Sequence, residues 1–445
     1  MPVSFPAPRT YPVDPAMSHR RGETRVRLLD ASGTPLADTD VVVEQQSHSF
    51  AFGCIGFDFI GLANDETGGG DGAFGGATAE QAAGLADAWL DVFNTATLPF
   101  YWAGFEPERG RPDTERLRRA AEWFAARGVT VKGHPLVWHT LAPDWLLDLG
   151  TDEVERVQRE RIRRDVSGFA GLIDTWDAIN EVVIMPVFDK EENGITRLCR
   201  ERGRIATIRL AFEEARAANP SATLVLNDFD MSTAYECLIE GVLEAGIQVD
   251  AIGLQSHMHQ GYWGEEKTLR ILERFARYGL PLHLTESTLL SGELMPPEIV
   301  DLNDYQVPSW PSTPEGEARQ ADEVVRHYRT LLSHPSVATV NYWGLTDAGA
   351  WLGAPVGLVR ADGTRKPAFD ALRGLVKDEW WVAPTTTRTD ADGVLTVEGW
   401  GGTYGIGRAA GDGPAATVTV EASGAHGPGS TPSGTASRTV DVTLG

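Results

Sequence analysis

The stretch WDAINE, residues 176–181, decides the fold, because it reads as a buried strand that ends on the amide of Asn180 and the carboxylate of Glu181. A second apolar stretch, LHLTE at residues 282–286, ends on Glu286 in the same way. A lone glutamate at a strand end is most often a surface residue. Two of them on strands of one barrel can face each other across a cleft. Cleavage of a glycosidic bond requires such a pair, one acid for the leaving oxygen and one carboxylate for the anomeric carbon.

Around these two strands, short apolar segments alternate with longer amphipathic segments over residues 50–376. Eight such pairs predict an α/β fold, the (β/α)8 TIM barrel, whose sites lie on the loops after the strands. A doubly wound open sheet is the alternative. Strands are predicted at residues 50–55, 93–98, 130–134, 175–180, 223–227, 251–255, 282–285 and 337–342. Helices are predicted at residues 79–91, 114–127, 152–169, 204–219, 234–245, 268–278, 316–333 and 367–376.

The ends of the chain differ from the barrel in composition. Residues 1–22 are rich in proline, and we expect them to be poorly ordered. Residues 23–49 hold two β-prone runs around a turn, which predicts an N-terminal β-hairpin. Residues 377–445 are rich in Thr, Val and Gly and predict a small β-rich domain. Because each part is too small to bury a core alone, we expect the hairpin to complete a β-sandwich with the C-terminal region.

Two loops are unusual in length or composition. Residues 64–76 are rich in glycine but contain no phosphate-binding pattern, so a flexible surface loop is the better interpretation. Residues 289–314 form a long, proline-rich segment directly after the second glutamate strand. A loop of that length beside a site usually shapes a pocket or a lid.

Composition restricts the partners and the compartment. The formal net charge of −24 disfavours nucleic acid and acidic membrane surfaces. Three widely spaced cysteines do not suggest a disulfide framework or a zinc knuckle. No apolar run reaches the length of a membrane span, and the N-terminus lacks the apolar region of a signal peptide. We therefore expect a cytoplasmic protein, or a secreted one if a leader has been removed. Its oligomeric state is left open.

Histidine and tryptophan side chains follow the third predicted strand, in VKGHPLVWH at residues 131–139. The odd spacing of His134 and His139 would place the two rings on opposite faces of an extended strand, which argues against a shared metal. No metal or other cofactor is therefore predicted. A better interpretation is a sugar pocket lined by His134 and Trp138, since an indole stacks on a pyranose and an imidazole binds its hydroxyls.

Two further motifs place polar and aromatic groups at strand ends. In GLQSH, residues 253–257, the side chains of Gln255 and His257 lie on one face because they are two positions apart. After the last predicted strand, the chain carries Trp343 and Trp351. A tryptophan is more often a packing residue than a ligand, but these two would lie on the rim where the glutamates emerge.

The motifs GHPLVWH, WDAINE, LND, GLQSH, LTE and WGLTD, in this order over residues 50–376, resemble glycoside hydrolase family 10, the endo-β-1,4-xylanase family. The resemblance implies hydrolysis of β-1,4-xylosidic bonds by a retaining double displacement. Glu286 would be the nucleophile and Glu181 the acid/base, with carboxyl groups about 5–5.5 Å apart. Asn180 would bind the 2-hydroxyl of the reacting sugar. The subsite of that sugar would be lined by His134, Trp138, Gln255, His257, Trp343 and Trp351.

The chain departs from the family where the next sugar on the non-reducing side would bind. The family usually carries Glu-Asn-x-Met-Lys-Trp after the second strand, whereas residues 97–102 read TLPFYW. Tyr101 therefore replaces the lysine and Leu98 the asparagine, while Leu141 replaces a glutamine. Apart from this subsite, the family usually carries an aspartate two residues after the nucleophile, where it supports the histidine, and this chain has Thr288 there. We expect residues 98–101 and Leu141 to wall this subsite, with Tyr101 in contact with substrate.

These departures leave two alternatives to xylan hydrolysis. One is a β-glycosidase that acts on a plant glycoconjugate, such as a saponin or flavonoid glycoside, or on a short decorated oligosaccharide. The other is an inactive sugar-binding protein, against which the presence of both glutamates and Asn180 argues.

Overall fold

The structure is a computed structural model that describes residues 14–66, 77–409, 411, 413–424 and 439–444. The chain forms two compact units. One comprises Phe52–Tyr328 and Ser336–Asp370, and the other comprises Met1–Ala51, Arg329–Pro335 and Ala371–Gly445. Within the described ranges, no helix is both long and apolar enough to cross a membrane.

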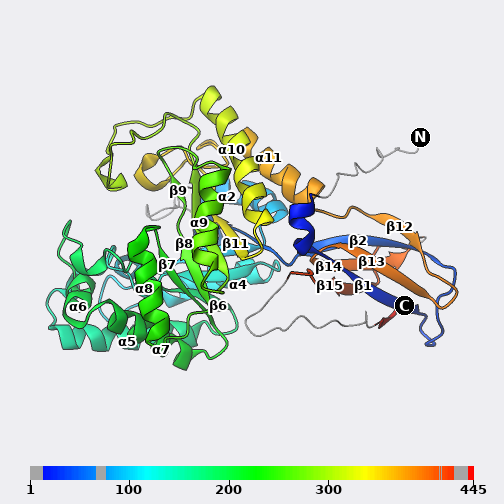
Figure 1. The fold of residues 1–445 in the computed structure, drawn as a ribbon, viewed down its shortest axis with the longest axis horizontal. Helices are drawn as coiled ribbons and strands as arrows, with labels where there is room; N and C mark the ends of the chain where they lie inside the picture. Colours follow the sequence, from blue (N-terminus) through cyan, green and yellow to red (C-terminus); the bar gives the residue numbers. More distant parts are fainter. Residues whose placement is uncertain (1–13, 67–76, 410, 412, 425–438, 445) are drawn as a thin grey trace. The chain divides into compact units, whose positions relative to one another are not determined.

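The larger unit is built on a closed sheet of parallel strands (Figure 1). Its strand order is β11-β3-β4-β5-β6-β7-β8-β10, and β10 also pairs with β11, which closes the barrel. The strands are β3 (Ala51–Ile55), β4 (Thr95–Pro99), β5 (Thr130–His134), β6 (Ile173–Asn180), β7 (Thr223–Asp228), β8 (Ala251–Leu254), β10 (Leu282–Leu289) and β11 (Val337–Tyr342). The predicted (β/α)8 barrel is therefore confirmed.

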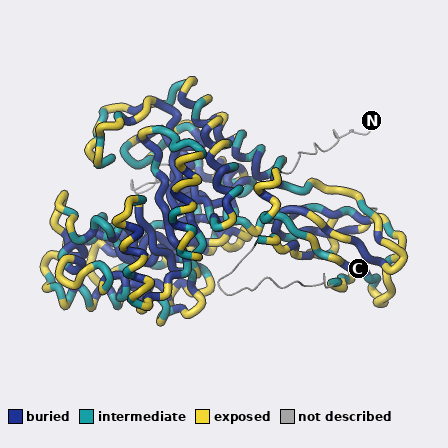
Figure 2. Tube along the Cα trace, in the orientation of Figure 1, coloured by how far each residue is buried: buried dark blue, intermediate teal, exposed yellow. Residues whose placement is uncertain are grey.

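Helices follow the strands, as the alternating pattern predicts. The predicted set is present as α2 (Ala79–Val92), α4 (Thr114–Ala125), α5 (Thr151–Gly168), α7 (Arg204–Ala218), α8 (Thr233–Glu244), α9 (Glu265–Ala276), α10 (Pro314–Ser333) and α11 (Pro367–Arg373). The last of these ends earlier than predicted, because residues Gly374–Glu379 continue as a π-helix. Figure 2 shows buried residues along the barrel strands and exposed residues on the outer sides of the helices.

Additional short helices interrupt the loops, namely α1 (Ile60–Ala63), α3 (Trp102–Phe105) and α6 (Gly194–Arg202). The sequence analysis does not predict α6, although the apolar side chains of Ile195, Leu198 and Cys199 have helical spacing and are buried. The side chain of Asn193 caps this helix by accepting a hydrogen bond from the Thr196 N–H at 2.7 Å. The cap fixes where the loop after β6 ends.

Close packing between two barrel strands requires a glycine. A Cβ atom on Gly133 would lie 2.2 Å from the indole ring of Trp176. The absence of a side chain at this position of β5 therefore lets the fully buried Trp176 of β6 pack against it. This contact positions β5 and β6, whose ends carry much of the site described below.

The smaller unit is a two-sheet β-sandwich. One sheet has the order β13-β1-β16, and the other has the order β12-β2-β14-β15. The N-terminal strands thus pair with C-terminal ones, as expected: β1 with β13 and β2 with β14, both antiparallel. The strands are β1 (Arg21–Leu29), β2 (Asp40–His48), β12 (Thr385–Arg388), β13 (Val394–Trp400), β14 (Gly402–Arg408), β15 (Ala416–Val420) and β16 (Val440–Thr443).

The predicted hairpin is wrong, because β1 and β2 belong to different sheets. Val26 and Leu28 of β1 and Val41 and Val43 of β2 are buried in one apolar cluster. Strands in two facing sheets can bring both apolar faces to this cluster from opposite sides, whereas a flat hairpin would present them on the same side. The predicted disorder is wrong for Pro15–Arg20, which form a 3-10 helix, whereas residues 1–13 and the glycine-rich residues 67–76 lie outside the described residues.

Candidate active site

The carboxylates of Glu181 and Glu286 belong to the segments that contain β6 and β10. Glu181 directly follows β6 and has a left-handed backbone with φ of 58°, a conformation that non-glycine residues rarely adopt. Its N–H donates to the Asn227 carbonyl at 2.9 Å, which supports this conformation. Glu286 lies within β10 rather than at its end, because a two-residue strand β9 (His257–Met258) pairs with Thr288 and Leu289 and extends β10.

Three amide side chains connect the two carboxylates. The Gln255 Nε2 group lies 3.1 Å from Glu181 Oε1 and 3.0 Å from Asn180 Oδ1. The Asn227 Nδ2 group lies 2.7 Å from Asn180 Oδ1 and 2.9 Å from Glu286 Oε1. All three amides are at least 97% buried, so their orientations are fixed by these hydrogen bonds. These three amides, which we call the amide relay, thus connect Oε1 of Glu181 with Oε1 of Glu286.

The Glu181 carboxyl also accepts a hydrogen bond from the Trp138 indole N–H, at 2.8 Å. Burial raises the pKa of Glu181, and the charge of Glu286 raises it further, while hydrogen bonds from Gln255 and Trp138 oppose the rise. A carboxyl with a raised pKa is suited to carry a proton. The environment thus favours a proton-donating role for Glu181.

Glu286 has a different set of partners. His257 Nε2 lies 3.0 Å from Glu286 Oε2, on the oxygen that Asn227 does not contact. On the other side of the imidazole, His257 Nδ1 lies 3.5 Å from the Thr288 hydroxyl. Thr288 therefore lies beside the His257 ring, as expected for the residue two positions after Glu286.

A buried ion pair fixes the histidine of β5. Asp177 Oδ2 lies 2.6 Å from His134 Nδ1 and 2.7 Å from the Lys132 ammonium group. Burial alone would raise the pKa of Asp177, but Lys132 and His134 outweigh it and hold that pKa below its usual range. Asp177 therefore stays ionised and orients the His134 ring.

Aromatic rings cover the side of the site formed by β3, β4, β5 and β11. The His134 ring contacts Trp343 at 5.1 Å and Tyr101 at 5.7 Å between centroids, and Tyr101 contacts Trp138 at 5.6 Å. Trp351 lies 5.1 Å from the His257 ring. The structure thus brings together all ten residues that the sequence analysis names for the site: Tyr101, His134, Trp138, Asn180, Glu181, Gln255, His257, Glu286, Trp343 and Trp351.

One predicted wall residue faces away from this group. Phe100 is fully buried and packs on Phe105, Phe169 and Trp176, with ring centroids 4.8–5.2 Å apart. It belongs to the hydrophobic core, because neighbouring residues of an extended segment point in opposite directions. The subsite wall therefore does not include Phe100, and Tyr101 is the aromatic group on the site side.

Several residues of the site were not singled out from the sequence, among them Asp177 and Lys132 of the buried ion pair. Asn227 is the penultimate residue of β7, in the LND stretch, and a polar amide at the end of an apolar run is a signal of the kind that identified Asn180. Phe57 packs its ring at 5.7 Å from Trp343 and 6.1 Å from Tyr101. No pattern in the sequence distinguishes Phe57 from an ordinary core residue.

The two histidines of the β5 stretch do not form a metal site. His134 pairs with Asp177, whereas the His139 ring lies 4.4 Å from Phe188, and burial lowers the pKa of His139 to about 4. Over the described residues, no group of three or more His, Cys, Asp or Glu side chains could hold a metal ion.

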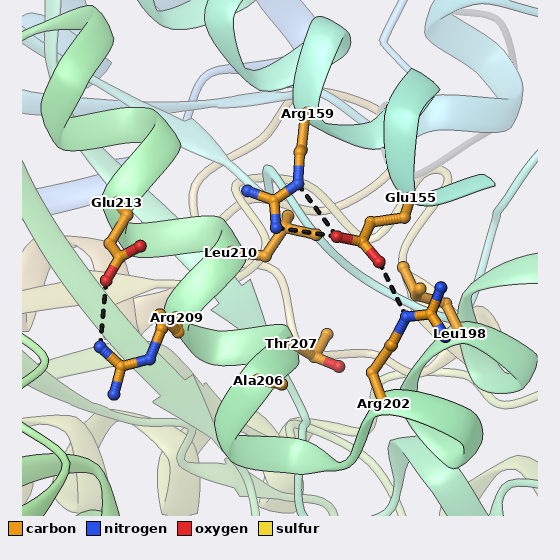
Figure 3. A pocket seen from close by; sticks show the side chains of 9 residues that line it. All are labelled: Glu155, Arg159, Leu198, Arg202, Ala206, Thr207, Arg209, Leu210 and Glu213. Atoms are coloured by element: carbon orange, nitrogen blue, oxygen red, sulfur yellow. Dashed lines mark hydrogen bonds and ion pairs between the residues drawn. The ribbon is translucent and has the colours of Figure 1, made fainter. Parts of the chain in front are cut away.

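A separate pocket of about 140 Å³ lies among α5, α6 and α7 (Figure 3). Its arginines are engaged in ion pairs: Glu155 pairs with Arg159 and with Arg202, each at 2.8 Å, and Arg209 pairs with Glu213 at 3.0 Å. Because carboxylates already neutralise these guanidinium groups, we assign no ligand to the pocket.

Comparison with known proteins agrees with this geometry. The model of glycosyl hydrolase family 10 matches residues 84–374. The endo-1,4-beta-xylanase B of Thermotoga neapolitana is 27% identical over 292 residues, which cover 62% of this chain and 78% of the relative. The anti-sigma-I factor RsgI6 of Acetivibrio thermocellus is 23% identical over 421 residues, covering 92% of this chain but 46% of the relative. The barrel of xylanase 10B from Thermotoga petrophila, solved with xylobiose, superposes with a TM-score of 0.59 at 23% identity, covering 74% of this chain and 94% of that one.

Proposed function

Because the chain belongs to glycosyl hydrolase family 10, we propose that it hydrolyses β-1,4-xylosidic bonds in xylan or xylo-oligosaccharides with retention, using Glu286 as nucleophile and Glu181 as acid/base. One observation carries these roles. A single amide relay holds both carboxylates, while burial and the Glu286 charge raise the pKa of Glu181. Retention predicts a separation of about 5–5.5 Å between the two carboxyl groups.

In the first step, a Glu286 oxygen attacks the anomeric carbon as the bond to the leaving oxygen breaks. Glu181 gives its proton to that oxygen, so the leaving group departs as a neutral alcohol. His257 and Asn227 each hold one oxygen of Glu286, which aligns the carboxylate for attack. The product of the step is a glycosyl ester on Glu286 and an ionised Glu181.

In the second step, Glu181 acts as a base. It takes a proton from a water molecule, whose oxygen attacks the anomeric carbon and displaces Glu286. The sugar leaves with its original anomeric configuration, and Glu181 regains its proton. The Trp138 and Gln255 hydrogen bonds keep the carboxyl of Glu181 in one place through both steps.

Recognition of the reacting sugar is assigned to the polar groups of the site. Asn180 would bind the 2-hydroxyl, a contact that strengthens in the transition state of such reactions. The rest of the subsite would be lined by His134, Trp138, Gln255, His257, Trp343 and Trp351. No cofactor enters the proposed reaction.

The aromatic side favours a second substrate class. Tyr101 stands where xylanases carry a lysine, and its ring lies against His134 and Trp138. Stacking binds the face of a sugar but selects its hydroxyl pattern poorly. A plant glycoside or a short decorated oligosaccharide is therefore the alternative substrate.

A substrate screen tests the proposal. The purified protein is assayed on aryl β-xyloside, β-xylobioside, β-glucoside and β-cellobioside, beside xylan and plant glycosides, with Glu286→Gln as the inactive control. Release of sugar by the unaltered protein and not by the control is expected. Equal, background release by both proteins on every substrate would favour the inactive sugar-binding protein instead.

A further inference from the structure

The loops that leave the two carboxylate strands meet at their tips. Lys190, nine residues after Glu181, places its ammonium group 2.7 Å from Asp304 and 3.5 Å from Asp301, in the long segment after β10. Asp301 also caps the short 3-10 helix Leu302–Asp304, which fixes the acidic pair on one turn. Figure 1 shows the segment before α6 and the segment before α10 projecting from the same barrel.

The order of the strands defines what this ion pair spans. β7 and β8 lie between β6 and β10 in the barrel. A contact from the loop after β6 to the loop after β10 therefore passes over the carboxyl ends of β7 and β8. The two loops, joined by Lys190 and Asp304, form the span that we call the bridge, comprising residues 182–193 and 290–313.

Both halves of the bridge are anchored to the loops beneath them. The Val183 N–H donates to Asp228 at the end of β7, at 3.0 Å. On the other side, the Met295 N–H donates to the His259 carbonyl at 2.9 Å, and the Gln260 amide donates to the Pro296 carbonyl at 2.9 Å. The long segment is thus a packed arm and not a loose loop.

An apolar cluster supports this arm from behind. Met295 and Trp310 of the long segment are buried together with Ala354 and Val356 of the loop after β11. The same loop carries Trp351, whose ring lies 5.2 Å from His259. Packing therefore sets the position of the arm, and the exposed ion pair links its tip to the loop after β6.

We propose that the bridge limits the length of the leaving group that the site can accept. The enzyme would then act on short chains or chain ends better than on bonds within long polymers. This inference rests on the proposed function, in which Glu181 protonates the leaving oxygen. The leaving group must lie beside Glu181 and away from Tyr101, which places it beneath the bridge. A long polymer can occupy that side only by threading an end under the bridge or by separating Lys190 from Asp304.

The first test removes the ion pair. In Lys190→Ala we expect kcat/KM on xylan, relative to an aryl β-xylobioside, to rise about two- to fivefold, the range that an exposed ion pair can supply. Arg388→Ala is the matched control, because Arg388 pairs with Asp40 at 2.9 Å at a similar exposure in the β-sandwich. A ratio in Lys190→Ala equal to that of the control would overturn the proposal.

The second test closes the bridge covalently. Lys190→Cys and Asp304→Cys are combined in a Cys237→Ser background, because the Cys237 thiol is exposed. A flexible thiol cross-linker is used, because a lysine side chain bridges a longer distance between Cα atoms than a disulfide allows. We expect the linked protein to lose most of its hydrolysis of xylan, while it keeps its activity on xylohexaose and on the aryl glycoside, because short chains can enter beneath the bridge by an end.

Failure of the cross-linker to join the two cysteines would overturn the geometry, and unchanged hydrolysis of xylan relative to xylohexaose after linking would overturn the proposal. The affinity for xylan, measured before and after linking in a Glu286→Gln background, does not depend on turnover and should fall in the same way. A protein that hydrolyses no glycoside would contradict the proposed function, while the effect of linking on xylan affinity would still decide the role of the bridge.

Discussion

The two sides of the site hold their residues by different physical means. On the side formed by β6, β7, β8 and β10, carboxylates and amides are tied together by hydrogen bonds between buried groups. On the side formed by β3, β4, β5 and β11, ring contacts dominate, among Phe57, Tyr101, His134 and Trp343. Under the proposed function, hydrogen-bonding groups of the polar side would orient the reacting sugar, with the His134 and Trp343 rings beside it. The next sugar would instead meet the Tyr101 ring, which binds through contact area.

The largest expected effect comes from the nucleophile on the polar side. Glu286→Gln removes the charge that forms the glycosyl ester, so we expect activity on every substrate to fall by about 10⁴-fold or more. Initial rates on an activated aryl glycoside measure the loss. Substantial activity in this variant would contradict the assignment of Glu286.

Substitution of the acid/base, Glu181, should reduce activity by an amount that depends on the leaving group of the substrate. We expect Glu181→Ala to lose about 10²- to 10⁴-fold on substrates with poor leaving groups, the usual range for general acid catalysis. Activated aryl glycosides need less protonation and should lose far less in the first step. Added azide should restore turnover with a β-glycosyl azide product; equal losses on both substrates without rescue would refute the role.

The amide relay predicts an intermediate effect. Asn227→Ala leaves Asn180 Oδ1 and Glu286 Oε1 each without one buried donor, at about 1–3 kcal/mol per lost partner. We expect kcat to fall about 10- to 100-fold, with little change in KM if the main loss is alignment. Gln46→Ala, an exposed amide of the β-sandwich, is the control. A normal kcat would show that the relay is dispensable.

The aromatic side should respond more weakly. Tyr101→Ala removes a ring that would contact the second sugar, so we expect about a tenfold loss of efficiency on an aryl xylobioside and a smaller one on an aryl xyloside. Tyr101→Phe keeps the ring and tests the hydroxyl separately. Equal losses on the two substrates would place Tyr101 beside the reacting sugar instead.

The smallest effect concerns stability and not rate. Burial raises the pKa of Asp228 to about 7, although backbone N–H groups of Asp230 and Val183 oppose the rise. The folded state therefore binds more protons than the unfolded state between about pH 4 and 7, and this group's contribution to stability is lost as the pH rises through that window. Denaturant unfolding across this range should show a shallower decline in Asp228→Asn; an unchanged slope would contradict the shift.

The sequence by itself determined the barrel and most of the site. The strands at residues 130–134 and 337–342 match the structure at both ends, because apolar runs bounded by amphipathic helices identify strands covered on both faces. Polar residues at the ends of such strands, such as Asn180 and Gln255, could be assigned to one site, since parallel strands bring their carboxyl ends to one rim.

Only the tertiary structure decided which strands and side chains meet. Alternating Val26 and Leu28 indicated burial but not the sheet to which β1 belongs, because both sheets of a sandwich face the same core. Likewise, the sequence could not place Phe100 in the core and Tyr101 at the site, since the direction of each side chain depends on the path of the chain after β4. The contact between Lys190 and Asp304 joins residues 114 positions apart. Local patterns record periodicity and turns, whereas such long-range contacts arise only when the barrel closes.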